Sequence, residues 1–405
     1  MGWRLVGAGA ATLAVLAGAA VTIAVTIAVT ARHRPAGGPA GGRDGQDALW
    51  RRIPDAFAAP PEATVSAVLL YPSADGCFSA TGIVDAGIRR HVGVWVAAGA
   101  CDTVRLEWPV EVPPTNPQIT QRETVVAATD PNGDGTWLTV VATTAGDRAW
   151  GELIHGGPSG GVSGRLREPL DDRGDVPVAV GAIHDQYAVV GRHGDEPTVY
   201  LSPSGSHWWD RPLPLPGTGP AEPLGVAGAP DVFRPERSAF DIGPGVVVGR
   251  AGGVAVIWSS ADGGVTWQVR AHPEAAELTG VVHDGSVFVA TGAGPGGDAV
   301  VLTSADGVTW QRDPRTVPAG ARPFRSVYAL RSPARPAFDL GGPPAPPPSV
   351  YAVSADGECA TVWRREPDAW VAEPLGCHGV PASLAQLADG RVAAVGGTTL
   401  WLRKP

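Results

Sequence analysis

The sequence predicts an all-β protein, a seven-bladed β-propeller preceded by one apolar N-terminal helix. Three observations indicate this fold. Gly and Pro account for 55 and 40 of the 405 residues and are spread between short apolar runs, which is typical of many short strands joined by turns. A strand–turn–Trp unit recurs along the chain. The sequence after the last Trp of the repeat is too short for a complete unit. Six or eight blades remain alternatives to seven.

The first element is an apolar segment over residues 5–30, which contains no charged residue and no Pro. As a helix it would be about 39 Å long, which exceeds the ~30 Å hydrocarbon core of a bilayer. We therefore expect residues 1–34 to form a single-pass membrane anchor. A secretory signal cleaved near Val29-Thr30-Ala31 is the alternative, and cleavage would release the protein from the cell.

A Gly/Pro-rich tether follows over residues 35–48, which read PAGGPAGGRDGQDA. A flexible chain of this length has an r.m.s. reach of roughly 20 Å. The remaining residues, 49–405, would form the propeller. Their acidic balance contributes to a formal net charge of −9, and no Lys/Arg-rich block is present. Because phosphate contacts need clustered cations, a nucleic-acid partner is not expected.

Arginines near the apolar segment indicate one orientation in the membrane. Arg32, Arg34 and Arg43 follow the segment, whereas Arg4 precedes it. The positive-inside rule therefore mildly favours a cytoplasmic propeller.

The four cysteines indicate the opposite side. Cys77 and Cys101 are 24 residues apart, Cys359 and Cys377 are 18 apart, and each pair brackets a stretch that reads as one hairpin. Local pairing of an even number of cysteines is typical of disulfides in an oxidising compartment. We therefore expect two local disulfides and a propeller outside the cell membrane, either anchored or secreted after cleavage. Four buried thiols in a cytoplasmic propeller are the alternative.

The repeat is clearest in two copies, S-A-D-G-G-V-T-W over residues 260–267 and S-A-D-G-V-T-W over residues 304–310. Each copy follows an apolar strand and precedes a short one. Two degenerate copies are S-P-S-G-S-H-W over residues 202–208 and T-A-G-D-R-A-W over residues 144–150. We expect each copy to join the third strand of a blade to its outermost strand.

The same pattern extends to Trp50, Trp108 and Trp370, so that seven tryptophans follow one another at intervals of 42 to 60 residues. Four-stranded blades of about 50 residues fit these intervals. Residues 383–404 have room for three strands, and residues 49–54 would supply the missing fourth. Strands from both ends of the domain would then close the ring and leave no open sheet edge there.

The turn from Ser260 to Trp267 resembles the Asp-box of the BNR, or sialidase-like, propeller families. The resemblance implies a structural turn between the third and outermost strands of a blade. Asp262 and Asp306 would accept backbone N–H groups across the turn. Gly263 and Gly307 would permit positive φ, and the tryptophans would pack between blades. The box residues are Ser260, Asp262, Gly264, Thr266, Trp267, Ser304, Asp306, Gly307, Thr309 and Trp310.

Sialidases of this superfamily carry an Arg in an R-I-P motif near the start of the propeller, and Arg52-Ile53-Pro54 has these three letters. An outermost strand also explains the segment, because LWRRIP occupies the place in its blade that TWQRDP, residues 309–314, occupies in another. The sequence does not allow assignment of the acid/base Asp, or of the Tyr nucleophile with its Glu partner. A sialidase-like glycoside hydrolase, or another carbohydrate-active protein, is therefore the alternative function, and no catalytic residue is named.

Asp130, Asn132, Asp134 and Gly135 spell D-x-N-x-D-G, which resembles the first half of a calcium loop. The twelfth position is Val141, which cannot supply the carboxylate expected there. Asn-Gly and Asp-Gly between two apolar runs are also strong signals for a hairpin turn. We favour the turn and predict no metal site and no cofactor.

Propeller ligands generally bind over the channel mouth, at loops from second to third strands and from blade to blade. The predicted strands place charged residues of both signs there, namely Arg89, Arg90, His91, Asp130, Asp134, Arg192, His193, Asp195, Glu196 and Arg250. Such a set suits a small polar ligand, a glycan or a protein loop. Because a fold does not define a function, the prediction is a membrane-tethered, extracytoplasmic scaffold that binds an unidentified protein or glycan.

Overall fold

The computed structural model describes residues 49–57, 63–73, 75–85, 90–109, 121–129, 137–145, 148–156, 162–166, 175–184, 186–205, 207–217, 219–229, 232–234, 239–331 and 347–405. Only the backbone is described for residues 90–91, 108–109, 121–129, 137, 143–145, 148–149, 155–156, 162–166, 232–234 and 239–241. The chain divides into two units, Met1–Gln46 and Asp47–Pro405. The predicted anchor and tether lie outside the described residues. Among the described residues, no helix is long and apolar enough to span a membrane.

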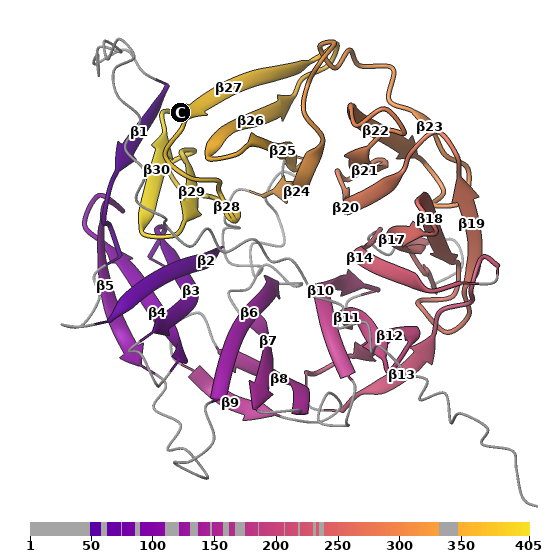
Figure 1. The fold of residues 1–405 in the computed structure, drawn as a ribbon, viewed down its shortest axis with the longest axis horizontal. Helices are drawn as coiled ribbons and strands as arrows, with labels where there is room; N and C mark the ends of the chain where they lie inside the picture. The colour runs from indigo at the N-terminus through magenta and orange to yellow at the C-terminus, as the bar shows by residue number, and fades with distance from the viewer. Residues whose placement is uncertain are drawn as a thin grey trace, which may run out of the picture. The chain divides into compact units, whose positions relative to one another are not determined.

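The described part of the chain is all-β, with seven four-stranded antiparallel sheets and one two-stranded sheet (Figure 1). Sheet 1 consists of β2 (Thr64–Pro72), β3 (Phe78–Asp85), β4 (Arg90–Ala98) and β5 (Thr103–Pro109). Sheet 2 consists of β6 (Gln121–Thr129), β7 (Trp137–Ala145), β8 (Arg148–Gly156) and β9 (Val162–Leu166). Sheet 3 consists of β10 (Asp175–Ile183), β11 (Gln186–His193), β12 (Glu196–Ser202) and β13 (Trp209–Pro212).

Sheet 4 consists of β14 (Ala221–Gly228), β17 (Gly245–Ala251), β18 (Val254–Ser260) and β19 (Gln268–His272), and the small sheet of β15 (Val232–Arg234) and β16 (Ala239–Asp241) interrupts it. Sheet 5 consists of β20 (Glu277–His283), β21 (Phe288–Ala293), β22 (Ala299–Ser304) and β23 (Gln311–Arg312). Sheet 6 consists of β24 (Phe324–Leu330), β25 (Ser349–Asp356), β26 (Cys359–Arg365) and β27 (Trp370–Gly376). Sheet 7 consists of β28 (Ser383–Gln386), β29 (Val392–Gly396), β30 (Thr399–Arg403) and β1 (Trp50–Ile53). The strands of each sheet are counted first to fourth in this order.

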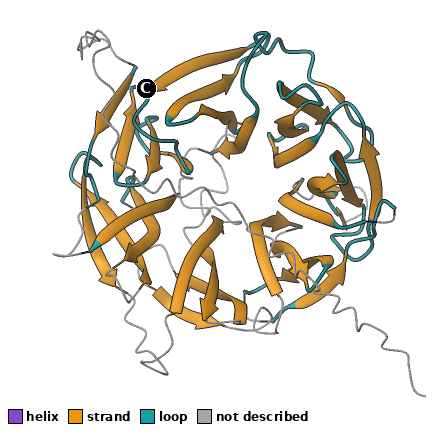
Figure 2. Cartoon of the chain, in the orientation of Figure 1, coloured by secondary structure: helices purple, strands orange, loops and turns teal. Residues whose placement is uncertain are grey.

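The first strands contact one another in a closed circuit. β2, β6, β10, β14, β20, β24 and β28 each contact the next, and β28 contacts β2 (Figure 1). A buried apolar cluster lies between each pair of consecutive sheets, and another lies between sheet 7 and sheet 1. Each sheet thus buries its two faces against two neighbours. Strands and loops alone make up this arrangement in the part of the chain that Figure 2 colours, and the predicted all-β propeller is confirmed.

Sheet 7 combines strands from both ends of the described chain. β1 pairs antiparallel with β30, with Trp50 opposite Arg403 and Ile53 opposite Leu400. The backbone N–H of Lys404 donates to the carbonyl oxygen of Leu49 at 3.0 Å, just before β1 begins. The incomplete last unit of the sequence is therefore completed by the first strand.

The first strands of six sheets share a β-bulge at the same place in their pairing with the second strand. The bulges fall between Ala67 and Leu69, Val125 and Ala127, Pro177 and Ala179, Pro223 and Gly225, Leu278 and Gly280, and Phe324 and Ser326. The extra residue bends the strand and increases its twist. In four of these sheets a Gly on the second strand lies where an added Cβ would come 2.0–2.2 Å from a carbonyl oxygen of the first strand. These are Gly82, Gly191, Gly249 and Gly292.

One turn of the predicted repeat lies one connection earlier in its sheet than expected. β7 ends at Ala145 and β8 begins at Arg148, so the copy over residues 144–150 joins the second strand to the third. Trp150 therefore lies within the third strand, where its Nε1 donates to the buried Glu152 at 2.8 Å. The prediction was wrong because Gly-Asp is a turn signal in any hairpin, whichever strands it joins.

We expect Gly249→Ala to destabilise the protein by about 2 kcal/mol, because the added methyl group would overlap a backbone carbonyl and force the strand to shift. Gly217→Ala is the matched control, since its added Cβ would meet no atom within 4 Å. Urea unfolding of both variants measures the difference. Equal unfolding midpoints for the two variants would contradict the requirement for Gly.

Candidate functional site

Because consecutive strands are antiparallel, the connections between them lie alternately at two opposite ends of each sheet. We call the end with the connections from second to third strand, and from one sheet to the next, the mouth end. The base end carries the connections from first to second strand and from third to fourth strand. The Ser-Asp turns lie at the base end, and the predicted ligand residues belong to the mouth end.

Five predicted ligand residues with described side chains lie at the mouth end. Arg192 and His193 end β11, Asp195 lies in the turn that follows, and Glu196 begins β12. Arg250 is the penultimate residue of β17, in the next sheet. Two neighbouring sheets, 3 and 4, therefore contribute all five.

The other predicted ligand residues either lie outside the described residues or have only their backbone described. Arg90 and His91 begin β4 at the mouth end of sheet 1, with only their backbone described, and Arg89 lies outside the described residues. Asp130 and Asp134 also lie outside them.

A buried carboxylate holds His193 at the mouth end of sheet 3. Asp175, the first residue of β10, is 1% exposed. Its Oδ1 accepts the O–H of Tyr200 at 2.6 Å and lies 2.8 Å from Nδ1 of His193. The His193 side chain is 53% exposed. Because a carboxylate on Nδ1 sets the orientation of an imidazole, three strands of one sheet present this ring in a defined position.

Arg250 lies between carboxylates from two sheets. Its Nη2 is 2.7 Å from Oε2 of Glu222, the residue opposite it on β14. Its Nη1 donates at 3.1 Å to Oε2 of Glu277, the first residue of β20 in sheet 5. The hydrogen bond with Glu222 raises the pKa of Arg250. With two carboxylate partners, Arg250 bridges two sheets and is poorly suited to clamp an anionic ligand.

The Ser-Asp turn of sheet 5 is held by its own side chains. Oδ1 of Asp306 accepts the backbone N–H groups of Val308 and Thr309 at 2.8 and 2.7 Å. Gly307 has a φ of +74°, as a turn of this kind requires. Nε1 of Trp310 donates to the carbonyl oxygen of Gly307 at 3.0 Å. The indole packs in the apolar cluster between sheets 4 and 5.

The equivalent turns of sheets 4 and 3 have similar geometry. Asp262 accepts the N–H and the O–H of Thr266 at 2.9 and 2.6 Å. Trp267 and Trp208 each donate from Nε1 to the carbonyl oxygen three residues earlier, at 3.0 and 2.9 Å. Each turn also starts with a Ser whose Oγ accepts a Gly N–H at 2.8 or 2.9 Å, and these are Ser202, Ser260 and Ser304. The box residues therefore bond one another, which is a structural role.

No motif in the sequence pointed to Glu373, a carboxylate on β27 that is 3% exposed. It accepts Nε1 of Trp50 at 3.0 Å, Nε and Nη2 of Arg403 at 2.9 Å each, and Nε of Arg364 at 3.2 Å. Trp50 and Arg403 belong to sheet 7, so Glu373 fastens sheet 6 to the sheet that closes the ring. Its alternation with the buried Leu375 is the sequence signal that indicates a buried position.

A second buried ion network joins sheets 5 and 6. Nε of Arg365 donates to Oδ2 of Asp313 at 3.1 Å, and Nη1 of Arg365 donates to Oδ2 of Asp284 at 2.5 Å. Nε1 of Trp370 also donates to Oδ2 of Asp313, at 3.3 Å. A small hollow of about 160 Å³ lies nearby, lined by residues that include Asp298, Arg312, Asp313 and Arg315. Its acids and bases are mixed, and Arg315 pairs with Asp313 at 3.1 Å, so the hollow favours no charge.

We expect the Asp306 turn to make stability depend on pH. Burial raises the pKa of Asp306, but the hydrogen bonds from Thr309, Val308 and Ser304 together lower it from 3.8 to about 2. A folded pKa below the unfolded one stabilises the protein above pH 3.8, and this stabilisation is lost as the pH falls toward 2. Asp306→Asn should therefore lower the melting temperature at pH 6, and the difference from the native protein should shrink below pH 4.

Differential scanning calorimetry at several pH values measures this difference. Asp195→Asn, at an exposed position of the mouth end, is the control and should change the melting temperature little at any of these pH values. A deficit of Asp306→Asn that stays constant down to pH 2.5 would contradict the proposed role of the carboxylate.

We expect Glu373→Ala to cost about 3–5 kcal/mol of unfolding free energy, because the change leaves Arg403 and Arg364 without their buried partner. Glu277→Ala is the control, since Glu277 also pairs with an Arg between two sheets but is 30% exposed. Its removal should cost less than about 1 kcal/mol. Urea unfolding checks both values, and similar costs for the two variants would refute the special role of Glu373.

No protein-family model matches the chain, and no curated protein matches it in sequence. Solved structures match it in fold. Streptogramin B lyase has a TM-score of 0.52 at 10% identity, over 88% of this chain and 97% of that chain. The β-propeller domain of Cps50 (Swd1) from Myceliophteria thermophila has a TM-score of 0.50 at 10% identity, over 87% and 98% of the two chains. The fold is that of a β-propeller.

Selenomethionine-substituted virginiamycin B lyase from Staphylococcus aureus is also similar to this chain, with a TM-score of 0.50 at 8% identity over 88% of this chain and 99% of that chain. Two of these three structures are named as lyases and the third as a propeller domain. At such low identities the likeness shows the fold alone, and it gives this propeller no activity.

Proposed function

We propose that the chain is a seven-bladed propeller of the Asp-box type, tethered to the outside of a cell membrane by residues 5–30, which binds a protein or glycan at its mouth end. The seven four-stranded sheets, each taken as one blade, support the blade count. The Ser-Asp turns between third and fourth strands, with their side-chain hydrogen bonds to backbone N–H groups, support the resemblance to the Asp-box.

The location outside the membrane is supported by the cysteines. Cys77 is bonded to Cys101 and Cys359 to Cys377, as predicted, and no free cysteine is present among the described residues. Disulfides form and persist mainly in oxidising compartments. The tether itself rests on the sequence, on the length and apolar character of residues 5–30.

One observation supports the binding role: the buried carboxylates described above bond to side chains of the protein itself. Asp175, Asp313 and Glu373 each bond to side chains of their own or a neighbouring sheet. These acids therefore hold strands and neighbouring sheets together. His193 and Asp195 are in contrast exposed at the mouth end, on connections that these sheets hold in place.

The hydrolase alternative rests on Arg52, which the structure places on the outermost strand β1, opposite Trp401 and exposed. An outermost strand explains the R-I-P letters without a substrate. We therefore favour the binding scaffold over the hydrolase.

Site-specific photo-cross-linking in the native membrane tests the proposal. A photoreactive residue in place of Asp195 is expected to capture a partner at the mouth end. The same residue in place of Val265, which is 55% exposed at the base end, is the control. Capture at position 195 should fall at least tenfold when Arg192 and His193 are changed to Ala. Equal capture at both positions, unaffected by these changes, would contradict a binding site at the mouth end.

A glycan partner is tested with the purified full chain on a glycan array, with the same Arg192→Ala, His193→Ala variant as control. Hydrolysis of a fluorogenic sialoside that is lost in Arg52→Ala would favour the hydrolase over the scaffold.

A further inference from the structure

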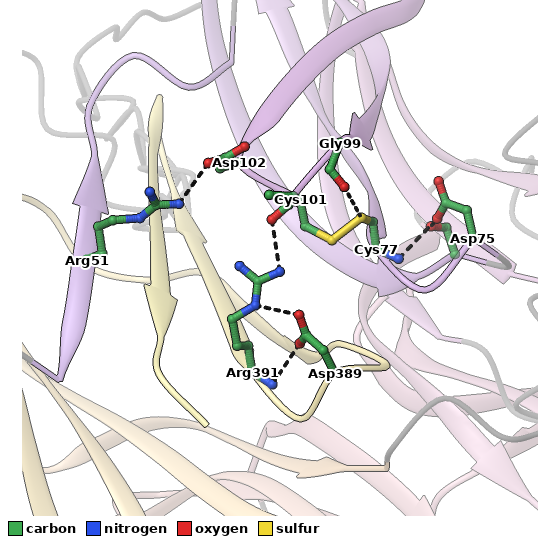
Figure 3. Close-up of a disulfide and its surroundings, with 10 residues drawn as sticks. Arg51, Asp75, Cys77, Gly99, Cys101, Asp102, Asp389 and Arg391 are labelled. Carbon is green, nitrogen blue, oxygen red and sulfur yellow. Dashed lines mark hydrogen bonds and ion pairs between the residues drawn. A yellow bond between two sulfur atoms is a disulfide. The ribbon is translucent and has the colours of Figure 1, made fainter.

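The contact between sheet 7 and sheet 1 is where the two ends of the propeller chain meet, and we call it the seam. Two base-end connections of sheet 1 lie along it. The described residues of the connection from β2 to β3 are residue 73 and residues 75–77, and the connection from β4 to β5 is formed by residues 99–102. The disulfide between Cys77 and Cys101 joins these two connections (Figure 3).

Both connections bond to sheet 7 at residues adjacent to a cysteine. The backbone N–H of Ala388, which lies between β28 and β29, donates to the carbonyl oxygen of Gly76 at 3.1 Å. Nη2 of Arg391 donates to the carbonyl oxygen of Ala100 at 2.9 Å. Arg391 is oriented by Asp389, whose Oδ2 accepts its Nε at 2.7 Å. The disulfide therefore fixes the distance between the carbonyl oxygens of Gly76 and Ala100, which accept the hydrogen bonds from sheet 7.

A third contact reaches the N-terminal strand. Nη2 of Arg51 on β1 donates to Oδ2 of Asp102 at 3.0 Å, and Asp102 follows Cys101 directly (Figure 3). β1 is only four residues long. A side-chain contact with sheet 1 therefore matters more for holding β1 in place than it would for a longer strand.

The cysteines are also part of the apolar packing of the seam. Cys77 is 6% exposed and Cys101 5%, and both belong to the cluster that contains Leu400 and Leu402 of β30. Cys101 has a φ of +61°, a left-handed conformation that is unfavourable for a residue with a side chain. Packing, hydrogen bonds and the covalent link hold it there together.

We propose that the Cys77–Cys101 disulfide locks the seam, so that the ring closes fully only when these two thiols are oxidised. In closing, the two thiols lose two electrons and two protons to an external disulfide, which becomes a dithiol, and the bond between the two sulfurs forms. A dithiol reductant reverses the step. The lock is independent of what the mouth end binds, and only its place in an oxidising compartment rests on the proposed function.

The second disulfide is a built-in control. Cys359 begins β26 and Cys377 follows β27, and both residues are exposed. β26 and β27 are neighbouring strands of one sheet that already pair with each other, with Ala360 opposite Gly376. This bond therefore closes a hairpin within sheet 6 and does not lie on the seam.

Hydrogen exchange measured by mass spectrometry on the full chain in detergent tests the lock. In the variant with Cys77→Ser and Cys101→Ser, the amides of β1 and of residues 387–391 should exchange at least tenfold faster than in the native protein. The variant with Cys359→Ser and Cys377→Ser should leave these amides unchanged. The proposal is overturned if the first variant exchanges like the native protein there, or if both variants accelerate exchange alike.

Graded reduction of the native protein avoids the need for a folded double variant. With a dithiol reductant and alkylation, the exposed Cys359–Cys377 bond should be reduced first, without faster exchange in β1. Reduction of Cys77–Cys101 should follow at least tenfold more slowly and coincide with faster exchange in β1. Arg391→Ala should speed the second reduction but not the first. Equal reduction rates, or an unchanged rate in Arg391→Ala, would overturn the lock. Neither outcome would bear on binding at the mouth end.

Discussion

The structure depends on the packing of each sheet against two neighbours. A four-stranded sheet here has no apolar core of its own, because its buried side chains contact the sheets before and after it. Val189 belongs to the cluster between sheets 2 and 3, although the next residue, Val190, belongs to the cluster between sheets 3 and 4. Consecutive residues of a strand thus pack against different neighbouring sheets. Because burial of apolar area supplies most of the stabilisation, no sheet is expected to be stable without its neighbours. The last sheet must therefore meet the first.

Several polar contacts between sheets lie where the ring closes. Glu373, with Trp50 and Arg403, fastens sheet 6 to sheet 7, and Arg391 and Arg51 fasten sheet 7 to sheet 1. Breaking a buried ion pair is costly because it leaves a charge without a partner. The short strand β1 is thus held on both sides.

The first strands are held close together by glycines. An added Cβ at Gly225 would lie 2.9 Å from Cα of Gly280, and one at Gly181 would lie 2.4 Å from the carbonyl oxygen of Val226. The bulges bend these strands, and the glycines on the second strands leave room for the carbonyl groups of the bent first strands. These positions are scattered among the 55 glycines of the sequence, so that composition alone does not reveal which of them are required. The tertiary contact distinguishes them.

By itself, the sequence determined the features whose partners are local. The Ser304–Asp306 turn, the two disulfides and the missing strand of the last unit follow from spacing, because their residues are neighbours in sequence or are counted by the repeat. Only the tertiary structure decided that Glu373 meets Trp50, that His193 meets Asp175, and that Arg250 already lies between Glu222 and Glu277. These partners come from other strands or other sheets, and their side chains meet only through strand register and the order of sheets around the ring. Sheet 2 is a further example. Its Gly-Asp turn could join any two antiparallel strands, and only the strand pairing shows that it joins the second strand to the third.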